Sequence, residues 1–430
     1  MSSPTGAPPP SHRYGARVLD ASTLAEIARE IEATDSDPEG VGIMTRKGRV
    51  YAIRLDGVPL TTAPILKQEI LSVGGDSAHA RGIADHSVPT SAVVLLATWG
   101  QYQRLFPKLK RQPFHLKEIA GEVERALRAY AGPRARKIAG VHRAFVVGDR
   151  PRVMGIVNVT PDSFFDGGAH TTPESAVEHA LALVADGADV IDVGGESTRP
   201  GAVEVSPEAE WTRVGPVLAA LHGRLEVPIS IDTRHDTIAA RAIDAGADLV
   251  NDVSGLRSEA MRRVAARTGA PVVVMHMRGT PPTMQSDLGY SDLRGEVYRG
   301  LAEATGRAIA DGVAPEQLLV DPGLGFGKSA EQSVELLFHA GELRSLGYPV
   351  VIGASRKSFL GALGGTPSTA ERLEAGLAAA VVAAERGVAL VRTHDVGPTV
   401  RALALVAAGD RLAAHRERDA ETLAVERPDE

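Results

Sequence analysis

Polar side chains that could bind a ligand recur at the ends of short apolar segments in the C-terminal two thirds of this 430-residue chain. They lie toward the end of a β-branched segment or shortly after it. They are Asn158, Asp192, Asp232, Asn251, Asp252, His276, Asp321, Ser355, Lys357, Arg392 and His394. A buried polar group without a partner costs roughly 2–7 kcal/mol. Packing alone therefore does not explain the series, and we interpret it as the lining of one site.

One part of this series is suited to anions. Thr198 and Arg199 follow the second apolar segment, and Arg392 and His394 end the eighth. The guanidinium fork of arginine matches the oxygens of a phosphate group bidentately. The sequence therefore predicts a phosphorylated substrate with these four residues as anion ligands.

The other part is suited to a heterocycle. Asp232, Asn251 and Asp321 end the third, fourth and sixth segments. A carboxylate beside an amide can bind a guanidine-like ring edge, and a charge-assisted pair of this kind contributes about 1.5–3 kcal/mol. Lys357 is placed to donate to a ring nitrogen or carbonyl.

The apolar segments themselves predict eight strands, each apolar at consecutive positions as in a strand buried on both faces. They span residues 153–160, 189–195, 228–233, 248–255, 271–277, 318–323, 349–355 and 388–394. Helical segments separate them, and most of these helices end at glycine. The distance from Arg152 to Ala413 is close to the about 250 residues of a (β/α)8 TIM barrel, which we favour over an open doubly wound sheet. Such barrels carry their chemistry at the C-terminal ends of the strands.

The rest of the chain divides into shorter regions. We expect a disordered tail at 1–12, an N-terminal α+β domain of unknown role at 13–140, a basic linker at 141–151, the barrel at 152–413 and a charged tail at 414–430. Within the N-terminal domain the pattern predicts a β-hairpin over 40–58 that turns near Lys47. It also predicts a helix over 64–75, a strand leading into a helix over 91–106 and a helix over 114–130.

Composition excludes several classes of function. The chain has no cysteine, so disulfides, thiolate catalysis and cysteine-bound zinc are excluded. A net charge of −7 gives no overall basic footprint for nucleic acid, and the basic residues between Arg104 and Arg111 are interpreted as a solvated face. A polar, proline-rich N-terminus and the absence of a membrane-length apolar stretch predict a cytoplasmic protein with no membrane partner.

Several longer motifs carry a family resemblance. The segments are NVTPDSFFDGG (158–168), ESTRPGA (196–202), IDT (231–233), ND (251–252), MHMRGTPPTMQ (275–285), DPGLGFGK (321–328), SRKSFLG (355–361) and RTHDV (392–396). In this order they resemble the dihydropteroate synthase family over the whole barrel. The first segment and SRKS are specific, whereas IDT or ND alone would be weak.

The resemblance implies a transferase reaction of folate biosynthesis in an enzyme class that sulfonamides target. p-Aminobenzoate displaces pyrophosphate from (7,8-dihydropterin-6-yl)methyl diphosphate, by a dissociative path assisted by Mg2+, to give 7,8-dihydropteroate. Asn158 resembles the magnesium ligand, and Asp232, Asp321 and Lys357 resemble the catalytic residues. The implied substrate-binding residues are Thr198, Arg199, Asp232, Asn251, Met275, Asp321, Phe326, Lys357, Arg392, Thr393 and His394. The resemblance also implies a homodimer with small-molecule substrates.

A glycine-flanked loop after the first strand is predicted to close over the site. Its residues Asp162, Phe164 and Asp166 would sandwich the p-aminobenzoate ring, and Gly167-Gly168 would give it mobility. The sequence departs from the expected family pattern at four positions. These are Phe165, Arg278, Leu324 and Thr393.

Plainer interpretations remain open for some residues. Asp192 and Asp252 are expected to hold loops or orient neighbours, and His276 to make hydrogen bonds behind the site. The GLGFG segment is expected to form a tight turn at the barrel rim and not a dinucleotide loop. Glu69, Asp76, His79 and His86 fit no metal-binding spacing.

Other functions are also compatible with a barrel of this kind. A methyltetrahydrofolate-dependent methyltransferase would have no use for the cations at Arg392 and His394. A Schiff-base lyase would use Lys357 as its nucleophile. An inactive pterin-binding paralogue is disfavoured because every proposed ligand position is filled.

Overall fold

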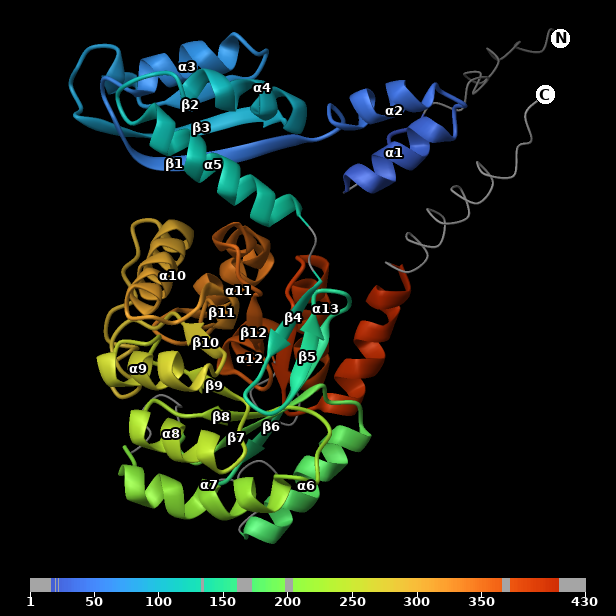
Figure 1. Cartoon of the computed structure of the whole chain (residues 1–430), viewed down its shortest axis with the longest axis vertical. Helices are drawn as coiled ribbons and strands as arrows, with labels where there is room; N and C mark the ends of the chain where they lie inside the picture. The colour runs from blue at the N-terminus through green and yellow to red at the C-terminus, as the bar shows by residue number, and fades with distance from the viewer. Residues whose placement is uncertain are drawn as a thin grey trace, which may run out of the picture. The chain divides into compact units, whose positions relative to one another are not determined.

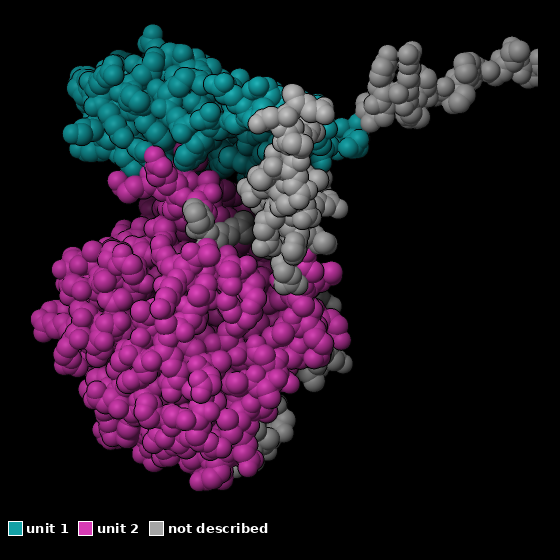
Figure 2. Space-filling view, turned by 45° about the vertical axis from the view of Figure 1, so that its right-hand side comes forward, with its two compact units in different colours: residues 1–124, 415–430 teal, residues 125–414 magenta. Residues whose placement is uncertain are grey.

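A computed structural model of the chain describes residues 17–19, 21, 23–132, 135–160, 172–197, 204–365 and 372–409. The chain divides into two compact units, coloured separately in Figure 2. One contains the chain up to Glu124, and the other runs from Arg125 to Ala414. No helix in the described part of the chain has the length and apolar composition needed to cross a membrane.

The larger unit is built on an eight-stranded sheet in which all neighbouring strands are parallel. Its strands are β6 (Arg152–Asn158), β7 (Val190–Gly194), β8 (Ile229–Asp232), β9 (Leu249–Asp252), β10 (Val272–Met275), β11 (Leu318–Asp321), β12 (Val351–Gly353) and β13 (Leu390–Thr393). They pair in the order β11-β10-β9-β8-β7-β6-β13-β12, and a parallel bridge between Val320 and Val350 joins the two ends. The TIM barrel expected from the sequence is confirmed.

Helices follow the strands and lie around the outside of the barrel (Figure 1). They are α6 (Pro173–Ala185), α7 (Pro207–Leu221), α8 (Asp236–Asp244), α9 (Glu259–Thr268), α10 (Leu293–Ala310), α11 (Ala330–Phe338), the short α12 (Ser358–Gly364), α13 (Leu373–Glu385) and a helix over 396–409. Side chains such as Ser206 and Ser258 cap their N-termini by accepting backbone N–H groups. Each such cap contributes about 1 kcal/mol.

The barrel core has two layers. The outer layer lies between sheet and helices, where Leu218, Leu221 and Ile238 are fully buried. Truncating one of these leucines to alanine would cost about 2–5 kcal/mol. The smaller inner layer is formed by residues in the N-terminal halves of the strands, including Met154, Val190 and Leu249.

A two-stranded ribbon completes this inner layer. β4 (Arg136–Ala139) pairs with β5 (Ala144–Val147), and Ile138, Phe145 and Val147 pack against the first residues of the barrel strands. The turn of the ribbon is fixed because Asp248 accepts the backbone N–H groups of His142 and Arg143 at 2.9 and 2.6 Å. Residues 136–147, which the sequence analysis divides between the N-terminal domain and a linker, therefore pack as part of the barrel unit.

The N-terminal unit contains a three-stranded antiparallel sheet in the order β1-β3-β2, formed by β1 (Val50–Pro59), β2 (Asp76–His79) and β3 (Thr90–Thr98). Its helices are α1 (Leu24–Glu32), α2 (Pro38–Thr45), α3 (Ala63–Leu71), α4 (Trp99–Leu109) and α5 (Leu116–Ala131), of which α5 continues into the barrel unit. The helices expected over 64–75 and 114–130 are confirmed. The strand leading into a helix that was expected over 91–106 is confirmed as well.

The β-hairpin expected over residues 40–58 is wrong. Its first half is helix α2, and β1 pairs instead with β3. The Asp37 carboxylate accepts the N–H groups of Glu39 and Gly40, and Pro38 stands at the first helical position. These are helix-start signals, and they outweigh the alternating apolar pattern of the segment.

Candidate active site

The predicted site residues end neighbouring strands and meet at the C-terminal opening of the barrel, here called the mouth. Asp232, Met275 and Asp321 are the last residues of β8, β10 and β11. Asn251 is the third residue of β9, and Arg392 the third of β13. Because parallel strands end at the same edge of a sheet, residues far apart in sequence become neighbours here.

A charged network crosses the mouth. The Arg392 guanidinium donates through Nε to Asp192 Oδ2 at 2.6 Å and through an Nη atom to Asp232 Oδ2 at 2.7 Å. Asn251 also donates to Asp192 Oδ2, at 3.0 Å. Asp192 is fully buried and therefore orients both Arg392 and Asn251. The sequence predicts such a supporting role for Asp192, but it does not indicate Arg392 as the partner.

Lys357 follows β12 and is the N-cap residue of α12. Its Nζ donates to the Leu324 carbonyl at 2.6 Å and lies 4.6 Å from the centre of the Phe326 ring. Asp321 accepts the Gly323 N–H at 2.6 Å. Met275, Met277, Met284 and Val253 form an apolar cluster with Phe326 at this side. A flat heterocycle would find an apolar wall beside a carboxylate and an ammonium group.

Burial and mutual charge perturb these groups strongly. Burial raises the pKa of Asp232 to about 7, although Arg392 acts in the opposite direction. Burial also raises the pKa of Asp321, opposed mainly by Lys357. The pKa of Lys357 falls to about 8 because of burial, with Asp321 opposing the fall. Shifts of this kind are typical of functional sites.

The GLGFG segment forms the tight turn that was expected at the barrel rim. Gly323, Gly325 and Gly327 all have positive φ, at 68°, 79° and 64°. A Cβ on Gly323 would lie 2.0 Å from the His276 carbonyl oxygen, so no other residue fits there. This turn brings the Leu324 carbonyl to Lys357 and leads directly into Lys328.

Lys328 was not identified from the sequence. Its buried ammonium group contacts His276 Nδ1 at 3.1 Å and donates to the carbonyls of His276 and Phe326 at 3.2 and 2.9 Å. Burial lowers the pKa of Lys328 to about 7 and that of His276 to about 3. His276 is therefore neutral near pH 7 and makes hydrogen bonds behind the apolar wall, as the sequence analysis expected. The sequence signal for Lys328 was its place directly after the glycine turn.

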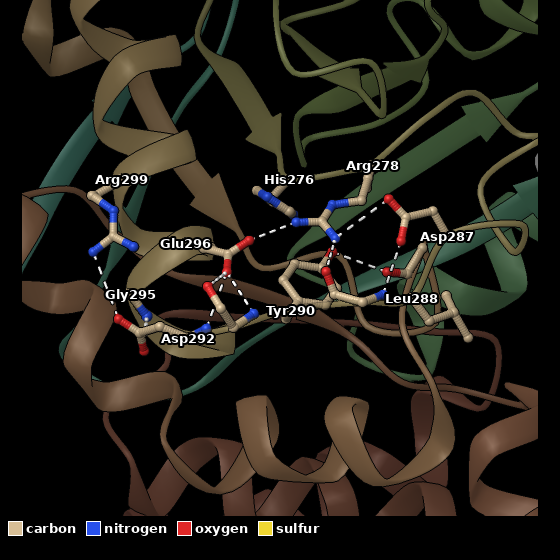
Figure 3. Close-up of polar contacts among 12 residues, drawn as sticks. His276, Arg278, Asp287, Leu288, Tyr290, Asp292, Gly295, Glu296 and Arg299 are labelled. Atoms are coloured by element: carbon tan, nitrogen blue, oxygen red, sulfur yellow. Dashed lines mark hydrogen bonds and ion pairs between the residues drawn. The ribbon is translucent and has the colours of Figure 1, made fainter.

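Arg278 anchors the loop between β10 and α10, as the close-up in Figure 3 shows. Its guanidinium lies 3.8 Å from the centre of the Tyr290 ring and donates to Glu296 at 2.6 Å and to the Gly289 carbonyl at 2.6 Å. The Tyr290 hydroxyl donates to the Gly327 carbonyl at 2.9 Å. Arg278 thus holds Tyr290, whose hydroxyl joins this loop to the glycine turn.

Of the four residues assigned to the anion, Arg392 lies in the charged network with Asp192 and Asp232, and His394 lies beside Asn158. Asn158 Nδ2 lies 3.4 Å from His394 Nε2, and His394 Nδ1 lies 3.1 Å from Ser355 Oγ. Thr393 turns its hydroxyl toward the following helix, where it accepts the Asp395 N–H at 3.1 Å. Thr198, Arg199, Asp162, Phe164 and Asp166 lie outside the described residues.

The donor set near Asn158 is compatible with magnesium. The Asn158 amide nitrogen faces His394, which leaves the amide oxygen as the atom for a hard cation. Mg2+ in proteins often takes one or two protein oxygens and completes its shell with water and substrate phosphates. One amide oxygen beside a phosphate site fits that pattern.

Comparison with known proteins identifies the barrel. A family described as pterin binding enzyme matches residues 154–394. The dihydropteroate synthase of Escherichia coli strain K12 is 46% identical over 258 residues, which are 60% of this chain and 91% of that protein. A structure of Yersinia pestis dihydropteroate synthase with a sulfonamide drug complex has 42% identity and a TM-score of 0.62, covering 64% of this chain and all of that one. A Xanthomonas albilineans dihydropteroate synthase with 7,8-dihydropteroate has 42% identity and a TM-score of 0.58, covering 64% of this chain and 99% of that one.

Longer relatives extend the similarity into the N-terminal unit. A probable bifunctional folylpolyglutamate synthase/dihydropteroate synthase of Halobacterium salinarum is 42% identical over 384 residues. These cover 89% of this chain, more than the barrel unit alone, and 46% of that protein. A Haloferax volcanii protein described in the same words is also 42% identical, over 43% of its length. The chain thus spans about half the length of these two relatives.

Proposed function

Since the chain belongs to the dihydropteroate synthase family of pterin-binding enzymes, we propose that it transfers a pterin-methyl group from (7,8-dihydropterin-6-yl)methyl diphosphate to p-aminobenzoate. The products are 7,8-dihydropteroate and pyrophosphate. The complexes of Xanthomonas albilineans dihydropteroate synthase with 4-aminobenzoic acid and with 7,8-dihydropteroate support the choice of substrates.

The observation that carries this proposal is the division of charge in the mouth. Asp232, Asn251 and Asp321 present acceptors and an amide to a heterocycle, whereas Arg392 and Lys357 place a cation beside each of the two carboxylates. Each carboxylate is held by its own partner and needs no rearrangement to bind a ring. Preorganised groups of this kind stabilise a transition state more than flexible ones.

The pterin would bind between the Asp232 and Asp321 carboxylates with its ring against Met275 and Phe326. As the bond from the methylene carbon to the diphosphate oxygen breaks, positive charge develops on the pterin and both electrons leave with the diphosphate. Asp232 and Asp321 stabilise this positive charge, and Lys357 and Arg392 stay near enough to limit their protonation. The amine nitrogen of p-aminobenzoate then forms the new bond to carbon and releases one proton.

The diphosphate would bind beside Asn158 and His394, with Thr198 and Arg199 as further anion ligands. Bound there, Mg2+ would neutralise charge on the leaving pyrophosphate, with the Asn158 amide oxygen as its protein ligand. Ser355 holds the His394 ring in place, which keeps Nε2 directed at Asn158. We also propose that Asp162, Phe164 and Asp166 close over p-aminobenzoate, and that the protein is a cytoplasmic homodimer.

A steady-state assay tests this function directly. Full-length protein is incubated with the pterin diphosphate, p-aminobenzoate and Mg2+, and pyrophosphate and 7,8-dihydropteroate are both measured. We expect equal amounts of the two products, strict dependence on p-aminobenzoate, and loss of turnover in Lys357→Ala. Pyrophosphate release without p-aminobenzoate would contradict the proposal.

The lyase alternative has its own test. Borohydride would trap an imine between Lys357 and a carbonyl substrate, and mass spectrometry would locate it. Trapping at Lys357 in the wild-type protein would favour the lyase over the transferase.

A further inference from the structure

Three potential metal ligands meet at the N-terminal ends of helices α7 and α8. Glu196 follows the end of β7, Glu210 lies in the first turn of α7, and His235 is the N-cap of α8. One ligand atom from each lies within 4.8 Å of the other two. His235 Nε2 is 3.8 Å from Glu196 Oε2 and 3.9 Å from Glu210 Oε2.

Glu210 is unusual because its carboxylate is completely buried. Among the described residues neither of its oxygens has a hydrogen-bond partner of standard geometry, and His235 Nε2 is likewise buried and without one. A buried acceptor left in this state costs about 1–3 kcal/mol, and more if it is charged. A single ligand between the Glu210 carboxylate and His235 Nε2 would satisfy both side chains.

The size of the cluster suits a transition-metal ion. A point equidistant from atoms with these separations lies roughly 2.2–2.5 Å from each, slightly longer than the about 2.0–2.2 Å bonds of zinc to imidazole nitrogen and carboxylate oxygen. Side-chain movements of a few tenths of an ångström would close the difference. Zinc binds imidazole nitrogen and carboxylate oxygen, and a water molecule would supply its fourth ligand here, whereas magnesium prefers oxygen alone.

The local charge also favours a cation. Arg234 donates to both Glu196 oxygens, at 3.0 and 2.9 Å, and to Glu204 at 2.5 Å. This single guanidinium compensates one of the negative charges of Glu196, Glu204 and Glu210. Burial raises the pKa of Glu210 to about 7, a shift that the nearby Thr233 hydroxyl opposes. A bound divalent ion would keep the Glu210 carboxylate ionised. Without that ion, the carboxyl group would take up a proton more readily.

We propose that Glu196, Glu210 and His235 bind one divalent transition-metal ion of the zinc type, at a structural site separate from the magnesium proposed in the mouth. Glu196 Oε1 accepts the Val205 N–H at 3.0 Å, so this side chain already joins the two ends of the segment between them. The metal would fix Glu196 to α7 and α8 and thereby hold the base of the segment that contains Thr198 and Arg199.

Metal binding to the full-length protein tests this site. The protein is stripped with a chelator and titrated with Zn2+ alone, and bound zinc and the melting temperature Tm are measured. His235→Ala and Glu210→Gln remove ligands, and circular dichroism verifies that both variants fold. His339→Ala is the matched control because His339 caps α11 and its ring contacts that helix's own Glu335 carbonyl. Asn158→Ala controls for zinc bound in the mouth.

We expect the wild type, His339→Ala and Asn158→Ala to bind one tight zinc ion and to gain Tm on binding it. His235→Ala and Glu210→Gln should bind it at least tenfold more weakly and gain little Tm. Equal zinc binding by the wild type and both ligand variants would overturn the proposal. So would loss of the tight zinc ion in Asn158→Ala, because that ion would then belong to the mouth.

Discussion

Arg392 on β13 and Asp192 on β7 form a 2.6 Å charge-assisted hydrogen bond at the mouth of the barrel. β6 lies between these two strands in the sheet, so the hydrogen bond reaches across the intervening strand. Asp192 is fully buried and also accepts from Asn251. The position of the Arg392 cation therefore depends on an aspartate that need not touch substrate itself.

Replacing that aspartate should reduce activity. Asp192→Asn removes one of the two carboxylates that hold Arg392 and leaves the guanidinium to Asp232 alone. A hydrogen bond to a charged group contributes about 1.5–3 kcal/mol, so kcat/KM should fall roughly 10- to 150-fold. Steady-state kinetics with both substrates measures this effect.

Asp189→Asn is the matched control for this variant. Asp189 precedes the same strand at its N-terminal end and accepts from Arg152 at 2.9 Å, away from the mouth. It should lower Tm and leave kcat/KM within about twofold of the wild type. An equal loss of kcat/KM in both variants would contradict a specific role of Asp192 in positioning Arg392.

The pH profile should reveal Lys357. The pKa of Lys357 is lowered to about 8 by burial, with Asp321 and Asp232 opposing the fall and Arg392 adding to it. Lys357 is therefore charged below this pH and loses its charge as pH rises through it. If the charged form is required, kcat/KM should decline tenfold per pH unit above about 8.

Lys357→Arg distinguishes this explanation from titration elsewhere. Arginine stays protonated in proteins, so its profile should stay flat above pH 8 even though its activity is lower. A basic limb that is unchanged in Lys357→Arg would assign the titration to another group.

Loss of Arg278 should weaken pterin binding. Arg278→Ala removes the stacking on Tyr290 and the ion pair with Glu296, which together hold the loop beside Met277 and Met284. We expect the Kd for pterin to rise about 5- to 30-fold, which corresponds to about 1–2 kcal/mol. Calorimetric titration measures it, and Glu342→Gln, which breaks the exposed ion pair with Arg294, should leave Kd unchanged. An unchanged Kd in Arg278→Ala would show that this loop does not support pterin binding.

Acid should release part of the stabilisation that Glu296 provides. The backbone N–H of Asp292 is the main cause that lowers the pKa of Glu296 to about 2, with further contributions from Ser291 and Arg278. Because this pKa is lower in the folded than in the unfolded chain, the stabilisation is complete above about pH 5 and is lost as pH falls toward 2. After allowance for solvent screening it amounts to about 1 kcal/mol.

Glu296→Gln tests this linkage. Its deficit in the free energy of unfolding should be largest near pH 6 and should shrink toward pH 2, as measured by urea denaturation. Glu335→Gln, which removes one carboxylate of an exposed pair with Arg294, is the matched control for the loss of a surface charge. A deficit for Glu296→Gln that stays constant with pH would contradict the assignment.

The barrel could be predicted because its signals are local and repeated. The strands are short apolar segments with polar residues near or after most of their C-terminal ends, and the helices repeat the apolar spacing of a buried face. The eight expected strands and the end-of-strand positions of Asp232, Asn251 and Asp321 all follow from this pattern. The β-hairpin predicted over 40–58 is wrong because the Asp37-Pro38 helix start is a stronger signal than the alternating pattern of the segment.

The partners within the site could not be predicted, because they depend on the three-dimensional closure of the sheet. Nothing local in the sequence pairs Arg392 with Asp192, or Lys328 with His276. The same is true of Glu210, which belongs to an ordinary amphipathic helix until α8 brings His235 opposite to it. The motifs identify the residues of the site, but the contacts among those residues depend on the topology of the fold.

The ribbon formed by β4 and β5 has a consequence for anyone who divides this chain into fragments. Ile138, Phe145 and Val147 cover the apolar side chains at the N-terminal base of the barrel. A fragment begun at Arg152, where the first barrel strand starts, would expose that base to water and invite aggregation. A fragment begun at Arg125, where the compact barrel unit starts, keeps this base covered.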